Sequence, residues 1–522
     1  MTVSILFMLN KKDIILSVLS GLLLAAGFPS VDFFPLAWIA LVPLMISLLD
    51  KGMKPAFILG MLSGFIYFLG TVFWVYNSIF FYGHLPAALS AVLVTVLCIY
   101  LSMYVAVFSM LFNYLTVRSR FPALFIAPVL WVTLEFLRTY TLTGFPWALL
   151  GYSQYKFLTI IQIADITGVY GVSFLIAAVN GAVFDIFFNL PKRLKEMPLS
   201  EQWPFSIGLI ILCSAIIASL LYGAWQLHAG GGHHTVRASV VQGNIDQDKK
   251  WDISFQRETI SEYKALTATA VSAAPSLIVW PETAVPFVFG HDETLTAEIT
   301  EFGKTLGAHL IFGGVTIKGI KDGRYQLSNS AILLSPDGNV LSVYDKIHLV
   351  PYGEYVPLRK LFPFVNRLVE GIGDFIPGRQ NTVMETPFAG IGSLVCYEII
   401  FPGLVRKFVD NGANLLVTVT NDGWFGRYSA PYQHFSMAVF RAVENRVPVI
   451  RAANTGISGF IDAHGRIKRK SDIFVRAVLT EDLEIGAFKK SFYSKYGDLF
   501  AFLCIISTIL LIANNIKMRN EK

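Results

Sequence analysis

The sequence predicts a polytopic α-helical membrane domain of eight spans joined to an exported α/β domain, and three observations indicate this fold class. Hydrophobic residues make up 54% of the 522 residues and charged residues only 15%, which excludes an ordinary soluble enzyme. Eight apolar runs have about the length that a bilayer requires. Between the seventh and eighth runs, short β-branched stretches alternate with helical ones, a pattern typical of an α/β domain.

The apolar runs divide the chain into three regions. They lie near residues 14–28, 33–49, 57–76, 87–115, 121–137, 166–188, 205–225 and 499–516. The first run could instead be a cleaved signal sequence, because Lys11 and Lys12 precede it, but the next apolar run follows almost at once. We therefore expect a membrane domain of seven transmembrane helices at 1–228, an exported domain at 229–490, and an eighth transmembrane helix with a cytoplasmic tail at 491–522.

Basic residues predict the orientation of these spans. One side of the membrane receives Lys11, Lys12, Lys51, Lys54, Arg118, Arg120, Lys192, Arg193, Lys195, Lys517, Arg519 and Lys522. The short loops of the other side hold only Arg138 and Lys156. The positive-inside rule therefore places both termini in the cytoplasm and residues 229–490 outside. The loop residues already explain the formal charge of +6, so no nucleic-acid partner is needed.

The exported region opens with the glycine-rich stretch AGGGHH and then alternates strands with helices. We expect strands at 236–242, 277–280, 310–316, 330–334, 340–344, 391–395, 415–420, 449–453 and 458–462. We expect helices at 254–274, 294–306, 401–409 and 432–445. This alternation, with added hairpins, predicts a two-sheet α/β domain.

Cys396 lies in the stretch GSLVCYEIIFP, where an apolar run ends and a helical pattern begins. A thiol at such a turn should be exposed and near helix amides, which favour the thiolate. A lone cysteine is more often a small buried hydrophobe. However, Cys98, Cys213 and Cys504 fall in predicted spans, so Cys396 is alone in the exported domain. An unpaired thiol in an oxidising compartment indicates use as a nucleophile.

Two further predicted strands end in side chains that could act in catalysis. Glu282 ends the run SLIVWPE, Lys346 follows the run that ends in VYD, and Glu354 comes eight residues after Lys346. Glu282, Lys346 and Cys396, each at a strand end, form a candidate catalytic set. No cluster of Cys and His has the spacing of metal ligands, so we expect neither a metal nor a cofactor.

The contexts of these residues, WPE, DKIHLVPYGEYVP and CYEI, resemble the nitrilase superfamily and, within it, the membrane-embedded apolipoprotein N-acyltransferases. The stretches VQGNIDQDKKWD and TNDGWFG extend the resemblance, and with the membrane half it covers nearly the whole chain. The resemblance implies an α/β/β/α sandwich and a multi-pass protein of the bacterial inner membrane with a periplasmic catalytic domain. It also implies two partners, a phospholipid acyl donor and a diacylglyceryl-modified apolipoprotein acceptor.

Acyl transfer requires a thiolate, a proton acceptor and positive charge where the oxyanion forms. Cys396 is suited to the nucleophile, Glu282 to the base, and Lys346 with the backbone amide of Tyr397 to the oxyanion. By resemblance, supporting roles fall to Glu354 and Glu398, which could orient Lys346 or the base or could equally be structural ion-pair partners.

Aromatic residues offer candidates for substrate binding. Trp251, Tyr397, Trp424 and Phe425 could line an acyl-chain or lipid-head pocket, or could serve only in packing. The apolar loop 361–378, which contains Phe362 and Phe364, predicts a lid that dips into lipid, unless it packs on its own domain. In the membrane half, Glu135, Arg138 and Asp165 are either inter-helix polar contacts or part of a lipid entry path.

Three function classes fit parts of this pattern. An acyltransferase would carry a fatty acyl chain from a phospholipid, as a Cys396 thioester, to the amino-terminal amine of a diacylglyceryl-cysteine lipoprotein, with ping-pong kinetics. A membrane-anchored amidase would use water as acceptor and has no need of eight spans. A transporter or receptor has no need of the Glu, Lys and Cys set. The acyltransferase accounts for both halves.

Overall fold

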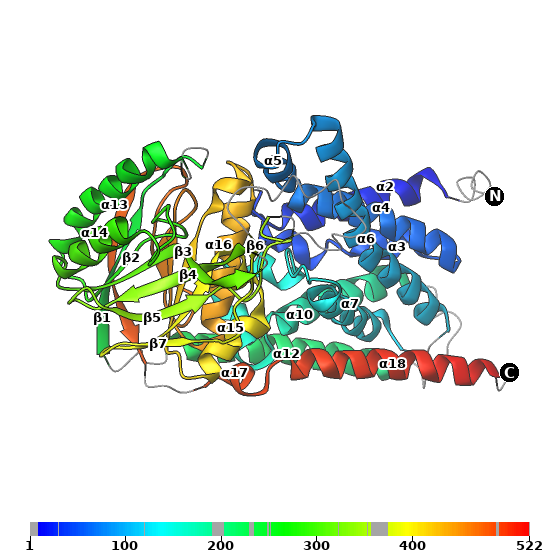
Figure 1. Cartoon of the computed structure of the whole chain (residues 1–522). Coiled ribbons are helices and arrows are strands. Elements are labelled where there is room, and N and C mark those ends of the chain that lie inside the picture. Colours follow the sequence, from blue (N-terminus) through cyan, green and yellow to red (C-terminus); the bar gives the residue numbers. More distant parts are fainter. Residues whose placement is uncertain are drawn as a thin grey trace. The chain divides into compact units, whose positions relative to one another are not determined.

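The computed structural model divides the chain into two units, which are described separately (Figure 1). Unit 1 comprises Met1–Phe80, Leu85–His228 and Tyr496–Lys522, and unit 2 comprises Phe81–His84 and Ala229–Lys495. The structure describes residues 9–29, 31–118, 121–189, 203–228, 234–247, 250, 252–321, 323–351, 353–355, 374–486 and 490–520.

Unit 1 is built from helices. Its α-helices are α2 (Lys11–Ala26), α3 (Val42–Ser47), α4 (Met53–Val72), α5 (Val75–Asn77), α6 (Ala87–Arg118), α7 (Ala123–Tyr140), α8 (Leu158–Ile161), α9 (Ala164–Thr167), α10 (Val169–Phe184), α12 (Trp203–His228) and α18 (Leu499–Asn520). Short 3-10 or π turns occur at η1 (Phe34–Trp38), η3 (Leu150–Gln154) and η4 (Asp185–Asn189), and η2 (Ser78–Tyr82) begins in unit 1 and ends in unit 2.

Six helices in the described part of the chain are long and apolar enough to cross a membrane: Met53–Val72, Ala87–Arg118, Ala123–Tyr140, Val169–Asn189, Phe205–His228 and Leu499–Lys517. The first two predicted spans differ from these. α2 has 16 residues, which gives a length of about 24 Å. The run 33–49 is divided between η1 and α3, because Pro35 and Pro43 each begin a new helical segment.

Buried polar side chains hold non-helical backbone inside unit 1. Arg138 Nη1 donates to the Trp147 carbonyl at 2.7 Å, and Glu135 Oε1 accepts from the Leu150 amide at 2.6 Å. Asp165 Oδ2 accepts from the Tyr222 hydroxyl at 2.6 Å. In the described structure Asp165 therefore joins α9 to α12, whereas Arg138 and Glu135 hold α7 to the loop before η3 and to the start of η3.

Unit 2 contains two β-sheets. The first has seven strands, β1 (His234–Gln242), β2 (Leu277–Val279), β3 (His309–Lys321), β4 (Arg324–Leu334), β5 (Val340–Asp345), β6 (Asp374–Phe375) and β13 (Ala477–Ile485), in the order β13-β1-β2-β3-β4-β5 with β6 paired to β4. The second has six, β7 (Val383–Glu385), β8 (Gly390–Val395), β9 (Leu415–Thr420), β10 (Val449–Ala453), β11 (Gly459–Ile461) and β12 (Ile467–Lys470), in the order β12-β11-β10-β9-β8-β7.

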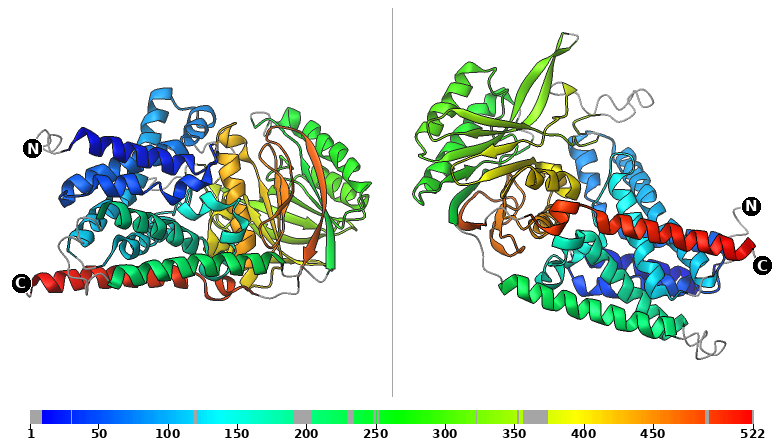
Figure 2. Two further views of the ribbon diagram at one scale, coloured as in Figure 1. Left: turned by 180° about the vertical axis from the view of Figure 1, so that it is seen from behind. Right: turned by 90° about the horizontal axis from the view of Figure 1, so that it is seen from below.

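Helices cover the outer faces of the two sheets. The helices of unit 2 are α13 (Gln256–Val271), α14 (Glu293–Lys304), α15 (Pro402–Asp410), α16 (Ala430–Asn445) and α17 (Phe492–Tyr496). The two sheets contact each other through β1 and β10, β3 and β9, and β4 and β8, whereas α15 contacts β8 and α16 contacts β10. The expected α/β/β/α sandwich is confirmed. β13, which was not expected, runs antiparallel beside β1 (Figure 2).

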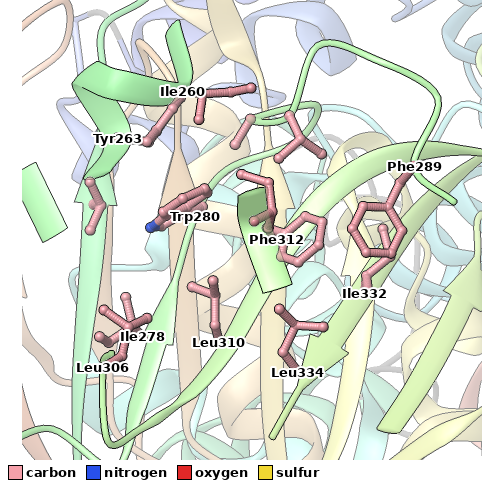
Figure 3. Close-up of a cluster of buried hydrophobic side chains, with 14 of the residues drawn as sticks. Ile260, Tyr263, Ile278, Trp280, Phe289, Leu306, Leu310, Phe312, Ile332 and Leu334 are labelled. Carbon is pink, nitrogen blue, oxygen red and sulfur yellow. The ribbon is translucent and has the colours of Figure 1, made fainter. Parts of the chain in front are cut away.

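Trp280 lies at the centre of the core between the first sheet and its helices (Figure 3). It is fully buried, and its indole Nε1 donates to Thr267 Oγ1 on α13 at 2.8 Å. Around it pack Ile260, Tyr263, Ile278, Leu306, Leu310, Phe312, Ile332 and Leu334. Because Glu282 follows two residues after Trp280, this packed core fixes the backbone from which Glu282 projects.

Candidate active site

Three strand ends in unit 2 carry the candidate catalytic side chains. Glu282 follows β2, Lys346 directly follows β5, and Cys396 directly follows β8. These residues are only 6%, 1% and 6% exposed. Lys346 Nζ lies 3.8 Å from Glu282 Oε1, and both charged groups act electrostatically on the Cys396 thiol. The structure therefore brings the three residues together in a buried site.

Close backbone packing positions Glu282. On β3, the Gly313 amide donates to the Pro281 carbonyl at 3.0 Å. A Cβ added to Gly313 would lie 2.5 Å from the Glu282 Cα, a distance that no side chain tolerates. Glycine at this position lets the loop that carries Glu282 lie directly against β3.

A single amide links the two carboxylates of the site. Asn329 Nδ2, on β4, donates to Glu282 Oε1 at 2.8 Å and to Glu354 Oε1 at 2.9 Å. Lys346 Nζ donates to Glu354 Oε1 at 2.9 Å. Burial alone would lower the pKa of Lys346, but Glu354, Glu282 and Cys396 outweigh it and raise that pKa above its ordinary value. Lys346 therefore keeps its positive charge in the buried site.

The geometry of Cys396 differs from the expectation in one respect. Its backbone φ is 54°, a left-handed conformation that is uncommon for a residue with a Cβ and often marks a functional turn. The prediction of an exposed thiol is wrong, because the turn is enclosed by unit 2. Burial, together with Glu282, raises the pKa of the Cys396 thiol far above its ordinary value, and Lys346 only partly opposes this. The resting group is therefore a protonated thiol.

Glu398 holds the two strand ends at Lys346 and Cys396 together. Its Oε1 accepts hydrogen bonds from the Tyr344 hydroxyl and from the amides of Ile347 and His348 at 2.7, 2.7 and 3.1 Å, and its Oε2 accepts from the Val395 amide at 2.8 Å. These donors lie next to Lys346 and next to Cys396. Glu398 therefore acts on the backbone of both residues.

Two known protein families match successive parts of the chain. The family described as Apolipoprotein N-acyltransferase N-terminal domain matches residues 20–182, and the family described as Carbon-nitrogen hydrolase matches residues 237–489. An apolipoprotein N-acyltransferase of Geobacter metallireducens is 45% identical over 96% of this chain and 95% of that protein. The chain belongs to the apolipoprotein N-acyltransferase family. A second relative of that name, from Chlorobaculum tepidum, is 32% identical over 98% of both chains.

The aromatic residues expected in this N-acyltransferase site lie in different surroundings. Tyr397 is 7% exposed and packs edge-on against Phe401, at 5.2 Å between ring centroids. Phe425 is 9% exposed, whereas Trp424 is 38% exposed and contacts the ring of Tyr82 edge-on, at 5.0 Å between centroids. Of these residues, Trp424 presents the most surface to a ligand. The other candidates, Trp251, Phe362, Phe364 and most of loop 361–378, lie outside the described residues.

Sequence reasoning missed two polar residues of the site, Asn329 and Lys250. Asn329 lies in the stretch LSNSAILL, where a polar trio interrupts an apolar strand, and that interruption was a usable signal. Lys250 is fully buried, and its Nζ donates to the Glu282 carbonyl oxygen at 2.8 Å. Among the described residues, no group of three or more His, Cys, Asp and Glu side chains is arranged to hold a metal ion.

A second buried charge cluster lies next to Cys396. Asp422, His434 and Arg451 are all 0% exposed. Asp422 Oδ2 contacts Arg451 Nη2 at 2.7 Å and Asp422 Oδ1 contacts His434 Nδ1 at 3.0 Å. Burial alone would raise the pKa of Asp422, but Arg451 and His434 outweigh it and hold that pKa at about 2. Asp422 therefore stays charged within the sandwich and forms an ion pair with Arg451.

Proposed function

We propose that the chain transfers a fatty acyl chain from a phospholipid to the amino-terminal amine of diacylglyceryl-cysteine apolipoproteins. The observation that carries this proposal is that Cys396, Glu282 and Lys346 lie close together in a buried site. The relatives that match this chain over nearly its whole length are named apolipoprotein N-acyltransferases. The relatives match both halves of the chain. This match does not favour the alternative of an amidase with water as acceptor.

The first half-reaction acylates the enzyme. Glu282 takes the proton of the Cys396 thiol, and the sulfur attacks the ester carbonyl of the phospholipid. Lys346, held charged beside Glu354, stabilises the oxyanion. As the C–S bond forms, the ester C–O bond breaks, and Glu282 returns the proton to the oxygen of the departing lysophospholipid. The product on the enzyme is a Cys396 thioester.

The second half-reaction delivers the acyl group. The amino-terminal amine of the lipoprotein attacks the thioester carbonyl, and Glu282 accepts a proton from the amine nitrogen. The C–S bond then breaks, and the sulfur regains a proton from Glu282. Because lysophospholipid leaves before the amine reacts, the kinetics should be ping-pong.

The membrane arrangement belongs to the same proposal. We place the protein in a bacterial inner membrane with eight crossings, formed by the six long helices, by α2 and by the 33–49 segment. Basic residues gather in the loops on the side of the termini, which supports cytoplasmic termini and a periplasmic catalytic domain. The regions are then 1–228 for seven helices, 229–490 for catalysis, and 491–522 for the eighth helix and tail.

Mass spectrometry of the purified full-length protein tests the chemistry. After incubation with phospholipid and no acceptor, the Cys396 peptide should gain the mass of one acyl chain, and lysophospholipid should appear at about one equivalent of enzyme. Adding a diacylglyceryl lipopeptide should remove that mass. The matched controls are Cys396→Ala, which should gain nothing, and Cys213→Ser, which replaces an exposed thiol and should behave as wild type. Lipopeptide acylation by Cys396→Ala near the wild-type rate would end the proposal.

A further inference from the structure

Lys250 is a buried charged residue that takes no part in the proposed acyl-transfer steps. It is 0% exposed, and its ammonium donates to the Glu282 backbone carbonyl at 2.8 Å. The loop that leads to it is anchored, because the Ile245 amide donates to Asn454 Oδ1 at 2.9 Å and Gln247 accepts a hydrogen bond from Asn421. A buried ammonium is costly unless nearby groups compensate it. The burial of its charge against Glu282, the proposed base, therefore needs an explanation.

The groups that face Lys250 are the reacting ones. Glu282 and Cys396 act on it electrostatically. Lys346 and Glu354 lie next to Glu282, and Asp422 acts on Cys396. Burial lowers the pKa of Lys250 to about 8, and Glu282 and Cys396 only partly oppose this. Lys250 is therefore mostly charged at neutral pH and mostly neutral above about pH 9.

We propose that Lys250 is a positioning residue that clamps the backbone of Glu282 and supplies the positive charge that offsets the Cys396 thiolate. The proposal rests on the proposed function, since it assigns Lys250 to the same proton transfer. When the S–H bond of Cys396 breaks and an O–H bond forms on Glu282, one negative charge moves from Glu282 to Cys396. Lys250 faces both positions, so its charge remains paired before and after the transfer.

The charges of the site support this assignment. Glu282 and Glu354, the two carboxylates that pair directly with Lys346, contribute two negative charges, and Lys346 can balance only one of them. Glu398 is stabilised separately, by its own four hydrogen bonds. Lys250 balances the second. Without Lys250, the thiolate would form in a buried site that already carries an excess negative charge, and such an excess raises the pKa of a thiol.

The test uses the full-length protein and three variants, with alkylation of Cys396 by iodoacetamide followed on the Cys396 peptide from about pH 6 to pH 10. Lys250→Met removes both the donor and the charge, and Lys250→Gln keeps a donor without the charge. Lys264→Met is the control, because Lys264 pairs with Glu298 on the helices outside the first sheet. Thermal unfolding of each variant verifies that it is folded, and Lys250→Gln carries the test if Lys250→Met does not fold.

Below about pH 7 we expect wild type to react about tenfold faster than either Lys250 variant, the scale of one pKa unit of the thiol. Above about pH 9 the advantage should shrink toward one, because wild-type Lys250 is then neutral. Lys264→Met should follow the wild-type curve. A wild-type-to-variant ratio that stays constant across this pH range, or that equals one throughout, would overturn the proposal. Alkylation needs neither lipid nor lipoprotein, so absence of acyl transfer by the wild type would refute only the proposed function.

Discussion

Two buried carboxylates flank the Cys396 turn, and they differ in how fully they are hydrogen-bonded. Glu398 accepts hydrogen bonds from the Tyr344 hydroxyl and from three backbone amides, so both of its oxygens are hydrogen-bonded. Glu282 accepts one, from Asn329, and its Oε2 has no hydrogen-bond partner within the described part of the chain. A carboxylate that is hydrogen-bonded at both oxygens holds structure, whereas an oxygen left without a partner in a buried site is available for a proton.

Glu282→Gln should have the largest effect on activity of the substitutions that test this difference. Gln cannot accept the thiol proton, so acyl transfer should fall by about a hundredfold or more. The amide oxygen can still accept the hydrogen bond from Asn329, and Lys250 can release its proton once Glu282 is neutral, so the free energy of unfolding should fall by only about 1 kcal/mol. Transfer of acyl groups to a lipopeptide and thermal unfolding measure the two quantities.

The matched control for this variant is Glu298→Gln, which neutralises a partly exposed carboxylate paired with Lys264. It should leave transfer unchanged. A loss of less than about threefold in Glu282→Gln would remove Glu282 from the role of base, since general bases contribute far more than that.

Glu398→Gln should reduce acyl transfer less than Glu282→Gln does, and should act mainly on the stability of the fold. One of its oxygens becomes an NH2 group that points at a backbone amide, so at least one buried donor loses its acceptor at a cost of about 1–3 kcal/mol. Activity should fall by about tenfold, because the strand ends at Lys346 and Cys396 lose their common anchor. The same two measurements apply. If this variant unfolds at the wild-type temperature, Glu398 does not hold the two strand ends together.

The sandwich was predictable wherever a strand is a continuous apolar run. β9 is buried at every position and stands out in the sequence. β13 does not stand out, because Glu481, Asp482 and Glu484 give it the composition of a surface segment. Its pairing with β1, which is distant in the sequence, leaves no local pattern either. In unit 1, hydropathy alone could not show that Pro35 and Pro43 divide the 33–49 run.

For the site, strand ends and the resemblance pointed to Glu282, Lys346 and Cys396, which the structure brings together. The burial of the Cys396 thiol depends on packing between segments far apart in the chain, so a local turn pattern gave the wrong exposure. The same limit applies to Lys250. A lysine beside Lys249 and Asp252 resembles a solvated charge run, and only the tertiary structure shows that it is buried against Glu282.

Tyr344→Phe should have the smallest effect of the three substitutions on stability and on acyl transfer. It removes one of the donors to Glu398 while keeping the buried ring, which is 0% exposed. The cost should be about 1 kcal/mol, and acyl transfer should stay within about threefold of wild type, since three backbone amides still hold Glu398.

This cost should depend on pH in a direction set by Glu398. Burial raises the pKa of Glu398 above its ordinary value, and the Tyr344 hydroxyl opposes this rise by stabilising the ionised form. A carboxyl with a raised pKa stabilises the fold at low pH, and that contribution is lost as the pH rises through the folded-state pKa. Without the hydroxyl, ionised Glu398 costs more, so the difference in unfolding free energy between Tyr344→Phe and wild type should grow from about pH 4 to pH 8. Thermal unfolding across this range measures it, with Tyr432→Phe, at a 39% exposed position, as the control. A difference that shrinks with rising pH would mean that Glu398 stays protonated when folded, and its full set of donors would then not be evidence of a structural carboxylate.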